Sequence, residues 1–266
     1  MSKTLLLTGA TDGIGLETAR ALVAQGHRVL VTGRNPTKLD RVVEELSRAG
    51  AVERYVADFS RLGEVAALAA AVADKHDHLD AIINNAGIFA VSTSLTDDGL
   101  DVRFAVNTLA PYILTQRLLS RMDASGRVVN VSSAAQQPVD LEALDHHVPM
   151  PDMAAYAQSK LALTAWSRQL ALQIGADGPV VVAVNPGSML GSKMVKEAFR
   201  VDGHDLQIGA EILVRATLDA EFASARGQYF DNDARAFGPP HGDVLNDVTS
   251  SAIVATMEAV ITRTLG

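Results

Sequence analysis

The sequence of 266 residues is 48% hydrophobic and 20% charged, a balance that is typical of a globular protein with a full core and not of a disordered chain. Its formal net charge of -8 opposes nucleic-acid binding through a general basic field, although a local site for an anion stays open. The chain has no cysteine, which excludes disulfides and thiolate metal sites.

The N-terminal segment predicts a strand and not a targeting signal. Residues 1–8 contain an apolar run that is too short for the hydrophobic region of a secretory signal, and they pass directly into a glycine-rich loop. Nowhere do 18 apolar residues follow one another, so the sequence predicts no membrane span. Together these features predict a cytoplasmic enzyme.

Short apolar runs alternate with longer helical stretches, the pattern of parallel strands joined by crossover helices. Most of the runs are too apolar for strands with one exposed face. We therefore predict one α/β domain over residues 1–266, with a doubly wound, mainly parallel seven-stranded sheet and helices on both faces. The expected strands are residues 4–8, 28–32, 53–57, 81–84, 127–132, 180–185 and 228–230.

Helical segments separate these runs. The second one is entered through Asn35-Pro36, a typical helix start. Residues 231–246 are rich in Pro, Gly and charge and predict a surface loop, after which helical periodicity returns and predicts a terminal helix. The expected helices are residues 15–25, 37–49, 62–75, 108–122 and 248–264.

A glycine-rich loop with the spacing Gly9-x-x-x-Gly13-x-Gly15 follows the first strand and opens the first helix. In this context, its backbone amides and the helix N-terminus predict a site for a pyrophosphate. The spacing differs from the usual Gly-x-Gly-x-x-Gly, and the lack of Gly-Lys-Ser/Thr excludes a Walker loop. The cofactor-binding residues expected here are Gly9, Thr11, Asp12, Gly13, Ile14 and Gly15.

The second strand ends at Gly33-Arg34, where an acidic residue would bind the ribose 2′-hydroxyl of NAD. Arginine suits a 2′-phosphate instead, because its planar guanidinium pairs with phosphate and stacks on adenine. The sequence therefore favours NADP(H), with NAD(H) as the alternative. Asp12 acts against this preference, because its charge would oppose the phosphate.

Tyr156 and Lys160 are four residues apart and share one face of a predicted helix. A neighbouring ammonium favours the phenolate, so Lys160 is expected to lower the pKa of Tyr156 and make it a proton shuttle. Taken alone, such a pair is usually just a solvated helix face.

The motifs together resemble those of the short-chain dehydrogenase/reductase family, from Lys3 to about Gly187. The resemblance implies a Rossmann-type fold and hydride transfer between nicotinamide and a carbonyl or alcohol substrate. The alternative is a cofactor-binding regulatory or structural protein that has lost the chemistry, against which the intact set of Ser133, Tyr156 and Lys160 argues. The matching motifs are Thr8-Gly9-x-x-x-Gly13-x-Gly15, Asp58, Asn84-Asn85-Ala86-Gly87, Asn107, Val131-Ser132-Ser133, Tyr156-x-x-x-Lys160 and Asn185-Pro186-Gly187.

The resemblance implies a role for each matching residue. Ser133 would bind the carbonyl oxygen, Tyr156 would exchange a proton with it, and Lys160 would bind the nicotinamide ribose. Asn107 would hold a water that connects Lys160 to solvent. No metal is needed. The implied catalytic residues are Asn107, Ser133, Tyr156 and Lys160. The cofactor contacts outside the glycine loop are Arg34, Asp58, Phe59, Asn85, Ala86, Gly87, Tyr156, Lys160, Pro186, Gly187 and Ser188.

The chain departs from the family's commonest members in two places. Tyr156 lies 23 positions after Ser133, which implies an insertion near residues 136–152. This insertion and the later Gly227-Gln228-Tyr229-Phe230 resemble the branch of retinol dehydrogenases and protochlorophyllide reductases, which implies NADP(H) and bulky apolar substrates. Pro186 and Gly187 resemble the segment that passes the nicotinamide in the family, called here the nicotinamide segment. A threonine often follows it, and Ser188 and Ser192 both remain candidates to replace that threonine.

Three further features leave alternatives. Residues 188–205 predict a mobile substrate lid, in which apolar side chains line the pocket or pack a helix on the core. His146 and His147 do not predict a metal site, because adjacent side chains on an exposed loop point apart. Homo-oligomers are common in the family, and the helix around Trp166 suits an interface or the core. The apolar lid and pocket candidates are Phe89, Met153, Met189, Met194 and Phe199; the interface candidates are Ala165, Trp166 and Leu170.

Overall fold

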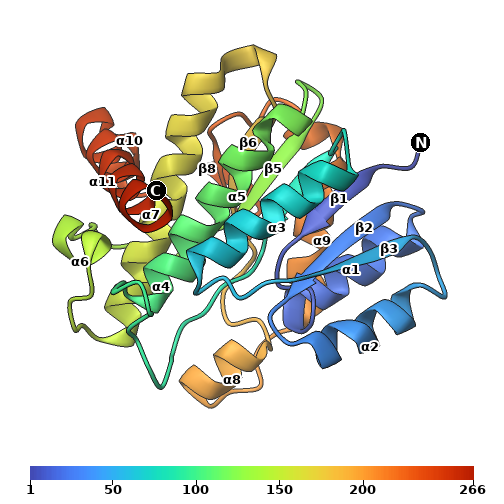
Figure 1. Ribbon diagram of the computed structural model, residues 1–266, viewed down its shortest axis with the longest axis horizontal. Coiled ribbons are helices and arrows are strands. Elements are labelled where there is room, and N and C mark those ends of the chain that lie inside the picture. Colours follow the sequence, from blue (N-terminus) through green and yellow to red (C-terminus); the bar gives the residue numbers. More distant parts are fainter.

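The protein, described here from a computed structural model, is an eight-stranded sheet with helices on both sides (Figure 1). The structure describes all residues except the side chains of Glu197, Ala198 and Phe199. The strand order is β3-β2-β1-β4-β5-β6-β7-β8, and all neighbouring strands are parallel except β7 and β8. The strands are β1 (Thr4–Leu7), β2 (Arg28–Gly33), β3 (Val52–Val56), β4 (Ala81–Asn84), β5 (Arg127–Val131), β6 (Val180–Asn185), β7 (Tyr229–Asp231) and β8 (Ala236–Gly238).

Two layers of helices bury the two faces of the sheet. One layer contains α3 (Leu62–Lys75), α5 (Ala110–Leu118) and α7 (Asp152–Ile174). The other contains α1 (Gly13–Ala24), α2 (Pro36–Leu46) and α9 (Leu206–Leu218). Because side chains alternate along a strand, Leu6 of β1 packs in the first layer while Leu5 and Leu7 pack in the second. The strands therefore have to be apolar on both faces, as the sequence pattern indicated.

The predicted doubly wound, mainly parallel sheet is confirmed, and each of the seven expected strands lies within a residue of its expected bounds. The count of seven is wrong, because β8 adds an eighth, antiparallel strand. The expected surface loop at 231–246 is accordingly wrong in part, since it contains β8 and the short helix α10 (Gly242–Leu245). Strand β8 has only three residues, Ala-Phe-Gly, too few to show a period of two.

The expected helices are present with adjusted bounds. The fourth one begins earlier than expected, with α4 (Val102–Phe104) and a π-helical turn η1 (Ala105–Leu109) before α5. It ends in a 3₁₀ turn, η2 (Leu119–Arg121). The terminal helix is α11 (Asp247–Leu265). The remaining elements are α6 (Leu141–Asp145), η3 (Gly175–Asp177), α8 (Lys193–Phe199) and η4 (Ala220–Phe222).

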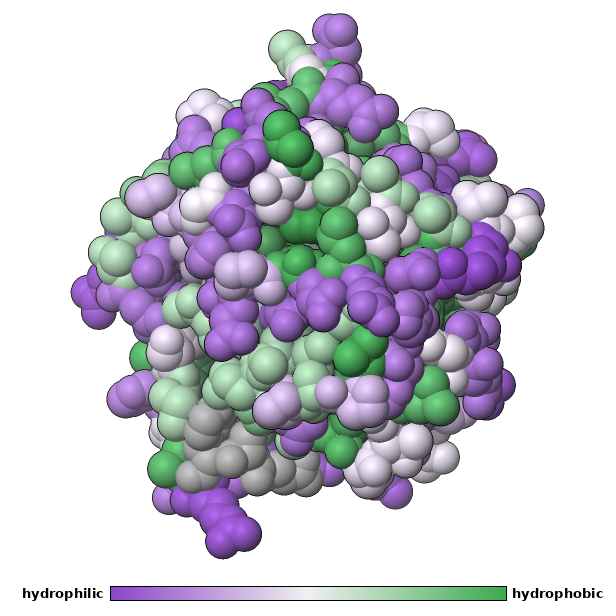
Figure 2. Space-filling model, turned by 90° about the vertical axis from the view of Figure 1, so that its left-hand side faces the viewer, coloured by the Kyte–Doolittle hydropathy of each residue, from purple (hydrophilic) through white to green (hydrophobic). Residues whose placement is uncertain are grey.

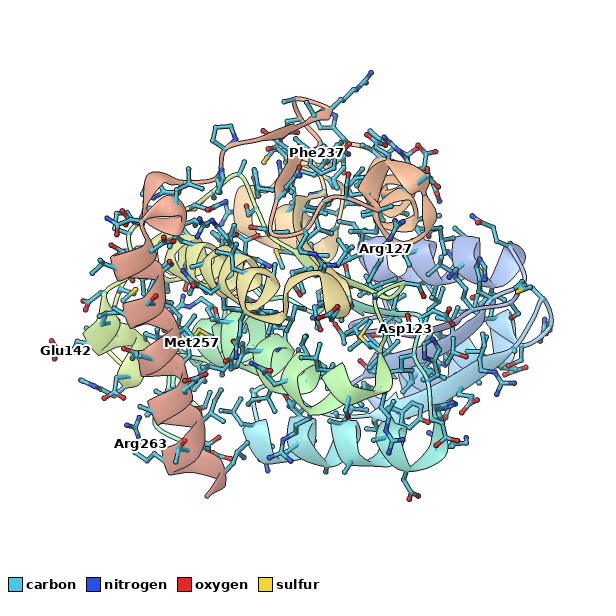
Figure 3. All side chains as sticks on the ribbon, turned by 90° about the horizontal axis from the view of Figure 1, so that it is seen from above. Asp123, Arg127, Glu142, Phe237, Met257 and Arg263 are labelled. Atoms are coloured by element: carbon cyan, nitrogen blue, oxygen red, sulfur yellow. The ribbon has the colours of Figure 1, made fainter. Side chains whose placement is uncertain are left out.

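Helix α11 covers α7 and α6, which lies in the segment 136–152 that the sequence predicts to be an insertion. Met257 of α11 is fully buried and points towards α7 and α5, whereas Glu142 of α6 points outward (Figure 3). Arg263 of α11 donates to Asp145 of α6 at 2.8 Å, which ties the insertion to this helix. Seen from the side of α6 and α11, hydrophilic and hydrophobic residues are interspersed on the surface (Figure 2).

The candidate interface residues of α7 lie in the core of the chain. Ala165, Trp166 and Leu170 are buried, and the Trp166 ring packs edge-on against Tyr112 at 5.4 Å between centroids. Of the two roles that the sequence allowed, the structure therefore shows the core. Among the helices of the described residues, none is long and apolar enough to cross a membrane.

Candidate active site

A cleft of about 1040 Å³ runs along the carboxyl ends of the parallel strands. Its walls come from the loops that follow β1 to β6, and its middle lies where the strand order reverses between β1 and β4. Ligands of open α/β sheets bind at such a switch point. All the predicted cofactor-binding residues line this cleft, and Asn107 is the one predicted catalytic residue that does not.

The glycines of the first loop allow the backbone of the β1 loop to pack directly on the β4 loop. Gly9 has φ +67°, and a Cβ there would lie 2.8 Å from the Cα of Ala86. A Cβ on Gly15 would lie 2.2 Å from the Gly9 carbonyl oxygen and 2.4 Å from the Asn85 amide nitrogen. That Asn85 amide donates to the carbonyl oxygens of Thr8 and Gly9 at 2.9 and 3.1 Å. The loop shape thus depends on the absence of side chains at these two positions.

Asp12 has a structural role in this loop. Its carboxylate caps α1 by accepting the backbone N–H of Gly13 at 2.7 Å. A carboxylate at this position also interacts favourably with the positive end of the helix dipole. The charge that the sequence set against an NADP site is therefore engaged by its own helix.

Two basic side chains lie at the end of the cleft beside β2. Arg34 follows the strand, and Lys38 lies one turn into α2, whose N-terminus is capped by Asn35. Within the described part of the chain, neither side chain has an acidic partner. A Cβ on Gly33 would lie 2.6 Å from the methyl group of Thr11, so the glycine lets these two loops meet. The sequence interpretation missed Lys38, although its position four residues after Arg34 was a usable signal.

The loop after β3 closes the same end of the cleft. Asp58 lines the cleft, and its carboxylate accepts the N–H and the hydroxyl of Ser60 at 2.9 and 2.7 Å. Phe59 is buried against the core next to α3 and contributes to the cleft wall. The carboxylate of Asp58 therefore also stabilises the turn that leads into α3.

Ser133, Tyr156 and Lys160 meet at the other end of the cleft. Helix α7 presents Tyr156 and Lys160 one turn apart, with the Lys160 Nζ 5.7 Å from the centroid of the phenol ring. The ammonium donates to the carbonyl oxygen of Val131 at 2.7 Å, and the ring of Phe89 packs edge-on against Tyr156 at 5.1 Å. Ser133 lies on the loop directly after β5, within hydrogen-bonding reach of the phenol.

The expected lowering of the Tyr156 pKa by Lys160 is wrong for this arrangement of side chains. Burial raises the pKa of Tyr156, and only the hydrogen bond with Ser133 opposes that shift. Burial also lowers the pKa of Lys160 to about 8. The cost of placing each charge away from water determines the direction of both shifts. Tyr156 therefore holds its proton at neutral pH.

Asn107 lies behind the cleft, in the π-helical turn η1. It is 1% exposed, and its side chain accepts the Ile88 N–H at 2.8 Å and donates to the Ile88 carbonyl oxygen at 2.9 Å. The same amide donates to Ser159 of α7 at 2.9 Å. The side chain of Asn107 thus joins the β4 loop to the helix that carries Tyr156 and Lys160. Its role in a water-linked relay stays a prediction.

The two serines of the nicotinamide segment differ in their surroundings. The hydroxyl of Ser188 donates to Asp233 at 2.6 Å, which draws it towards the β7–β8 turn. Ser192 caps α8 by accepting the Val195 N–H at 3.3 Å, and its Cβ lies 3.6 Å from the position of a Cβ on Gly13. Of the two, Ser192 faces the glycine loop.

Backbone hydrogen bonds join the two ends of the expected lid, residues 188–205. Gly191 donates its N–H to the His204 carbonyl oxygen, and His204 donates its own to the Met189 carbonyl oxygen, both at 2.7 Å. Its two ends thus lie side by side. Four of the five apolar candidates line the cleft, namely Phe89, Met153, Met189 and Met194. The side chain of Phe199 lies outside the described residues.

The two histidines of the insertion diverge. His146 faces Glu142 and Asp145 at 3.4 and 3.6 Å, whereas His147 shares a 2.8 Å hydrogen bond with Ser94. The described residues contain no group of three or more potential metal ligands.

A cleft of this kind belongs to the class of α/β proteins that bind dinucleotides at the switch point of an open sheet. Residues 3–202 match the family model described as short chain dehydrogenase, and the chain belongs to this family of oxidoreductases.

Similar proteins indicate to which branch of the family the chain is related. The WW domain-containing oxidoreductase of Gallus gallus is 30% identical over 99% of this chain and 69% of its own length. Retinol dehydrogenase 13 of Homo sapiens is 28% identical over 86% of this chain and 76% of its own length. The expected resemblance to the retinol dehydrogenase branch is therefore confirmed.

Solved structures share the fold. A protein from Mycobacterium paratuberculosis has a TM-score of 0.80 and 28% identity, covering 98% of this chain and 93% of its own. A short chain dehydrogenase from Burkholderia cenocepacia in complex with NADP has a TM-score of 0.70 and 26% identity, covering 86% and 95%.

Proposed function

We propose that the protein transfers a hydride between NADP(H) and a carbonyl or alcohol substrate, with Tyr156 as general acid and base. The observation that carries the proposal is the meeting of Ser133, Tyr156 and Lys160 at one end of a cleft that has a glycine-rich loop in its wall. The bound nicotinamide would supply or accept the hydride.

The cleft fits a dinucleotide along its whole length. Gly9, Gly13 and Gly15 line the cleft at the start of α1, where the backbone amides and the helix N-terminus would receive a pyrophosphate. At one end, Lys160 offers a buried ammonium for ribose hydroxyls. At the other end, Arg34 and Lys38 offer two cations for a 2′-phosphate.

The chain's own groups suit the reduction of a carbonyl. Ser133 would donate its hydroxyl to the developing alkoxide, while Tyr156, which keeps its proton because burial raises its pKa, would donate that proton to the same oxygen. In oxidation Tyr156 would accept a proton from the alcohol, and a protonated Lys160 would favour the phenolate that this requires.

The substrate end of the cleft favours a bulky apolar molecule. Phe89 packs against Tyr156 at this end, and three methionines, Met153, Met189 and Met194, line the same cleft. Methionine side chains adapt to irregular apolar shapes. Two of these residues, Met153 and Met189, are also partly exposed at 40% and 37%, so apolar surface is available to a substrate. The name of the human relative, a retinol dehydrogenase, agrees with this class.

Replacing the tyrosine tests the chemistry. We expect Tyr156→Phe to keep NADPH binding and to lose at least about 100-fold in turnover, because the ring remains and the proton is removed. NADPH consumption would be followed by absorbance with a panel of ketones and aldehydes, and NADPH binding by fluorescence titration. Turnover equal to that of the unmodified protein would overturn the assignment. Binding without turnover of any substrate by the unmodified protein would favour a regulatory cofactor binder.

Removing the cations beside β2 tests the cofactor preference. We expect Arg34→Ala and Lys38→Ala each to raise the KM for NADPH about tenfold and to leave the KM for NADH nearly unchanged, because each removes a charge-assisted hydrogen bond to the 2′-phosphate. Arg41→Ala is the matched control, since this exposed arginine of α2 does not line the cleft. Equal effects on both cofactors would mean that neither side chain recognises the phosphate.

A further inference from the structure

The β7–β8 hairpin presents different side chains to the two faces of the sheet. On one face, the rings of Phe222, Phe230 and Phe237 pack against one another with centroids 5.0 to 5.1 Å apart. Phe237 is labelled in Figure 3. Because side chains alternate along a strand, Tyr229 and Asp231 face the other way, where they bond Ser133 and Asn185. The aromatic cluster therefore anchors the hairpin and leaves its polar groups available for the loops of the active site.

Tyr229 holds the loop that carries Ser133. Its phenol is 6% exposed and donates to the Ser133 carbonyl oxygen at 3.1 Å, where Gln136 donates a second hydrogen bond at 3.0 Å. The backbone of the serine that would bind the substrate oxygen is thus fixed by two donors from outside its own strand.

The turn of the same hairpin holds the nicotinamide segment. Asp233 accepts the N–H of Ser188 at 2.8 Å and its hydroxyl at 2.6 Å, and it accepts the side-chain amide of Asn185 at 2.9 Å. Asp231 accepts the Asn185 amide at 2.8 Å. Asn232 donates two hydrogen bonds to this segment. Its backbone N–H donates to the Asn185 carbonyl oxygen at 3.1 Å, and its side-chain amide donates to the Pro186 carbonyl oxygen at 2.9 Å.

We propose that Tyr229 and Asp233 are positioning residues that hold the Ser133 loop and the 185–188 loop in register from one rigid hairpin. The proposal rests on the proposed function, in which one loop binds the carbonyl oxygen and the other passes the nicotinamide. Hydride transfer requires the two reacting carbons at close contact, and a misplacement of about 1 Å costs about 100-fold in rate. A common support for both loops keeps this distance fixed.

The polar groups of Tyr229 and Asp233 are not needed to hold the hairpin itself. The β6–β7 and β7–β8 pairings and the buried Phe222 and Phe230 remain when a hydroxyl or a carboxylate is removed. Variants that lose only these groups should therefore fold, and their defects should appear in the two loops.

The first test removes the phenol hydroxyl. We expect Tyr229→Phe to lower kcat about tenfold, to raise the primary isotope effect measured with NADPH deuterated at the transferred position, and to keep the Kd for NADPH within twofold. Hydrogen–deuterium exchange should become faster in residues 132–137. Tyr55→Phe is the matched control, because its hydroxyl bonds His76 far from the cleft. Unchanged kcat with unchanged exchange in 132–137 would overturn the role of Tyr229.

The second test removes the carboxylate. We expect Asp233→Ala to weaken NADPH binding about tenfold and to speed the exchange of residues 186–189, while Asp233→Asn, which keeps one acceptor oxygen, has a smaller effect on both. Asp177→Ala removes the same charge from an exposed position and should change neither. An unchanged Kd for both Asp233 variants would overturn its role.

The two proposals fail in different ways. NADPH binding and hydrogen–deuterium exchange can be measured without turnover. They therefore test the positioning roles of Tyr229 and Asp233 even if the unmodified protein binds NADPH and reduces no carbonyl. That result would contradict the proposed function alone. If the unmodified protein turns over and the Tyr229 and Asp233 variants match it in kcat, Kd and exchange, the positioning role fails and the proposed function stands.

Discussion

Lys160 is expected to cost the protein stability at neutral pH, and its replacement by methionine should recover it. Lys160 is 4% exposed, and burial lowers its pKa from 10.5 to about 8. At about 1.4 kcal/mol per pH unit, keeping this ammonium charged at pH 7 costs the folded state about 3 kcal/mol relative to the unfolded chain. The substitution also removes the hydrogen bond from Lys160 to the Val131 carbonyl oxygen, which lowers the stability of the variant by about 1 kcal/mol. Lys160→Met, of similar length and fully apolar, should therefore stabilise the protein by about 2 kcal/mol at pH 7.

The pH dependence distinguishes this cause from better packing. Between pH 8 and 10.5, the folded protein has lost the Lys160 proton while the unfolded chain still binds it, so the unmodified protein gains stability as pH rises. The advantage of Lys160→Met should thus shrink towards zero across that window. Urea unfolding at pH 7 and pH 9.5 without cofactor measures it, with the exposed Lys196→Met as control. A difference that is the same at both pH values would refute the burial argument.

Two further predictions concern the cleft. We expect kcat/KM for NADPH to fall as pH rises through about 8, because the free protein then loses the ammonium of Lys160 that we propose to bind the ribose. A pH–rate profile with varied NADPH and saturating carbonyl tests this, and a flat profile to pH 10 would contradict it. We expect Gly15→Ala to abolish measurable NADPH binding, because its Cβ would lie 2.2 Å from the Gly9 carbonyl oxygen. The control Gly63→Ala on α3 has no atom within 4 Å of the new Cβ, so it should bind NADPH normally and gain up to about 1 kcal/mol in stability. Calorimetric titration measures the binding and urea unfolding the stability; normal binding by Gly15→Ala would show that the loop can move apart.

Much of the site follows from the sequence because the glycine loop, Arg34, Asn85 and Ser133 lie directly after expected strands. In a parallel sheet the carboxyl ends of all strands lie at one edge, so the loop at Gly9, the segment at Asn85 and the serine at 133 had to come together once the strands were placed. The position of Arg34 at the end of β2 likewise determined which end of the cleft it occupies. These positions are consequences of the sheet topology, which the alternation of apolar runs with helical stretches predicts.

The contacts of the β7–β8 hairpin could not be predicted in the same way. Asp233 bonds Ser188 across 45 residues of sequence, and Tyr229 bonds Ser133 across 96. Neither bond has a local pattern, because nothing in the composition of a short, polar turn says which distant loop it will meet. The segment after residue 230 was therefore predicted as a surface loop, although the structure shows Asp233 bonded to Asn185 and Ser188.

The π-helical turn at Asn107 could not be predicted from the sequence either, because it is associated with contacts to residues that are distant in the sequence. Its side chain satisfies both polar groups of Ile88 and the hydroxyl of Ser159, which requires Asn107 to face the β4 loop and α7 at once. A widened turn permits this because it changes where successive side chains point, and such turns are frequent at functional sites.

The pKa of Tyr156 shows most clearly what local reasoning leaves out. Spacing on a helix gives the distance between an ammonium and a phenol, and hence the sign of their attraction. It does not give the burial of either group, and here burial shifts both pKa values towards the neutral forms. The consequence is functional, since a phenol that retains its proton is prepared to donate it to a carbonyl oxygen. In the proposed reaction, oxidation would use the same groups in reverse, with the phenolate formed first.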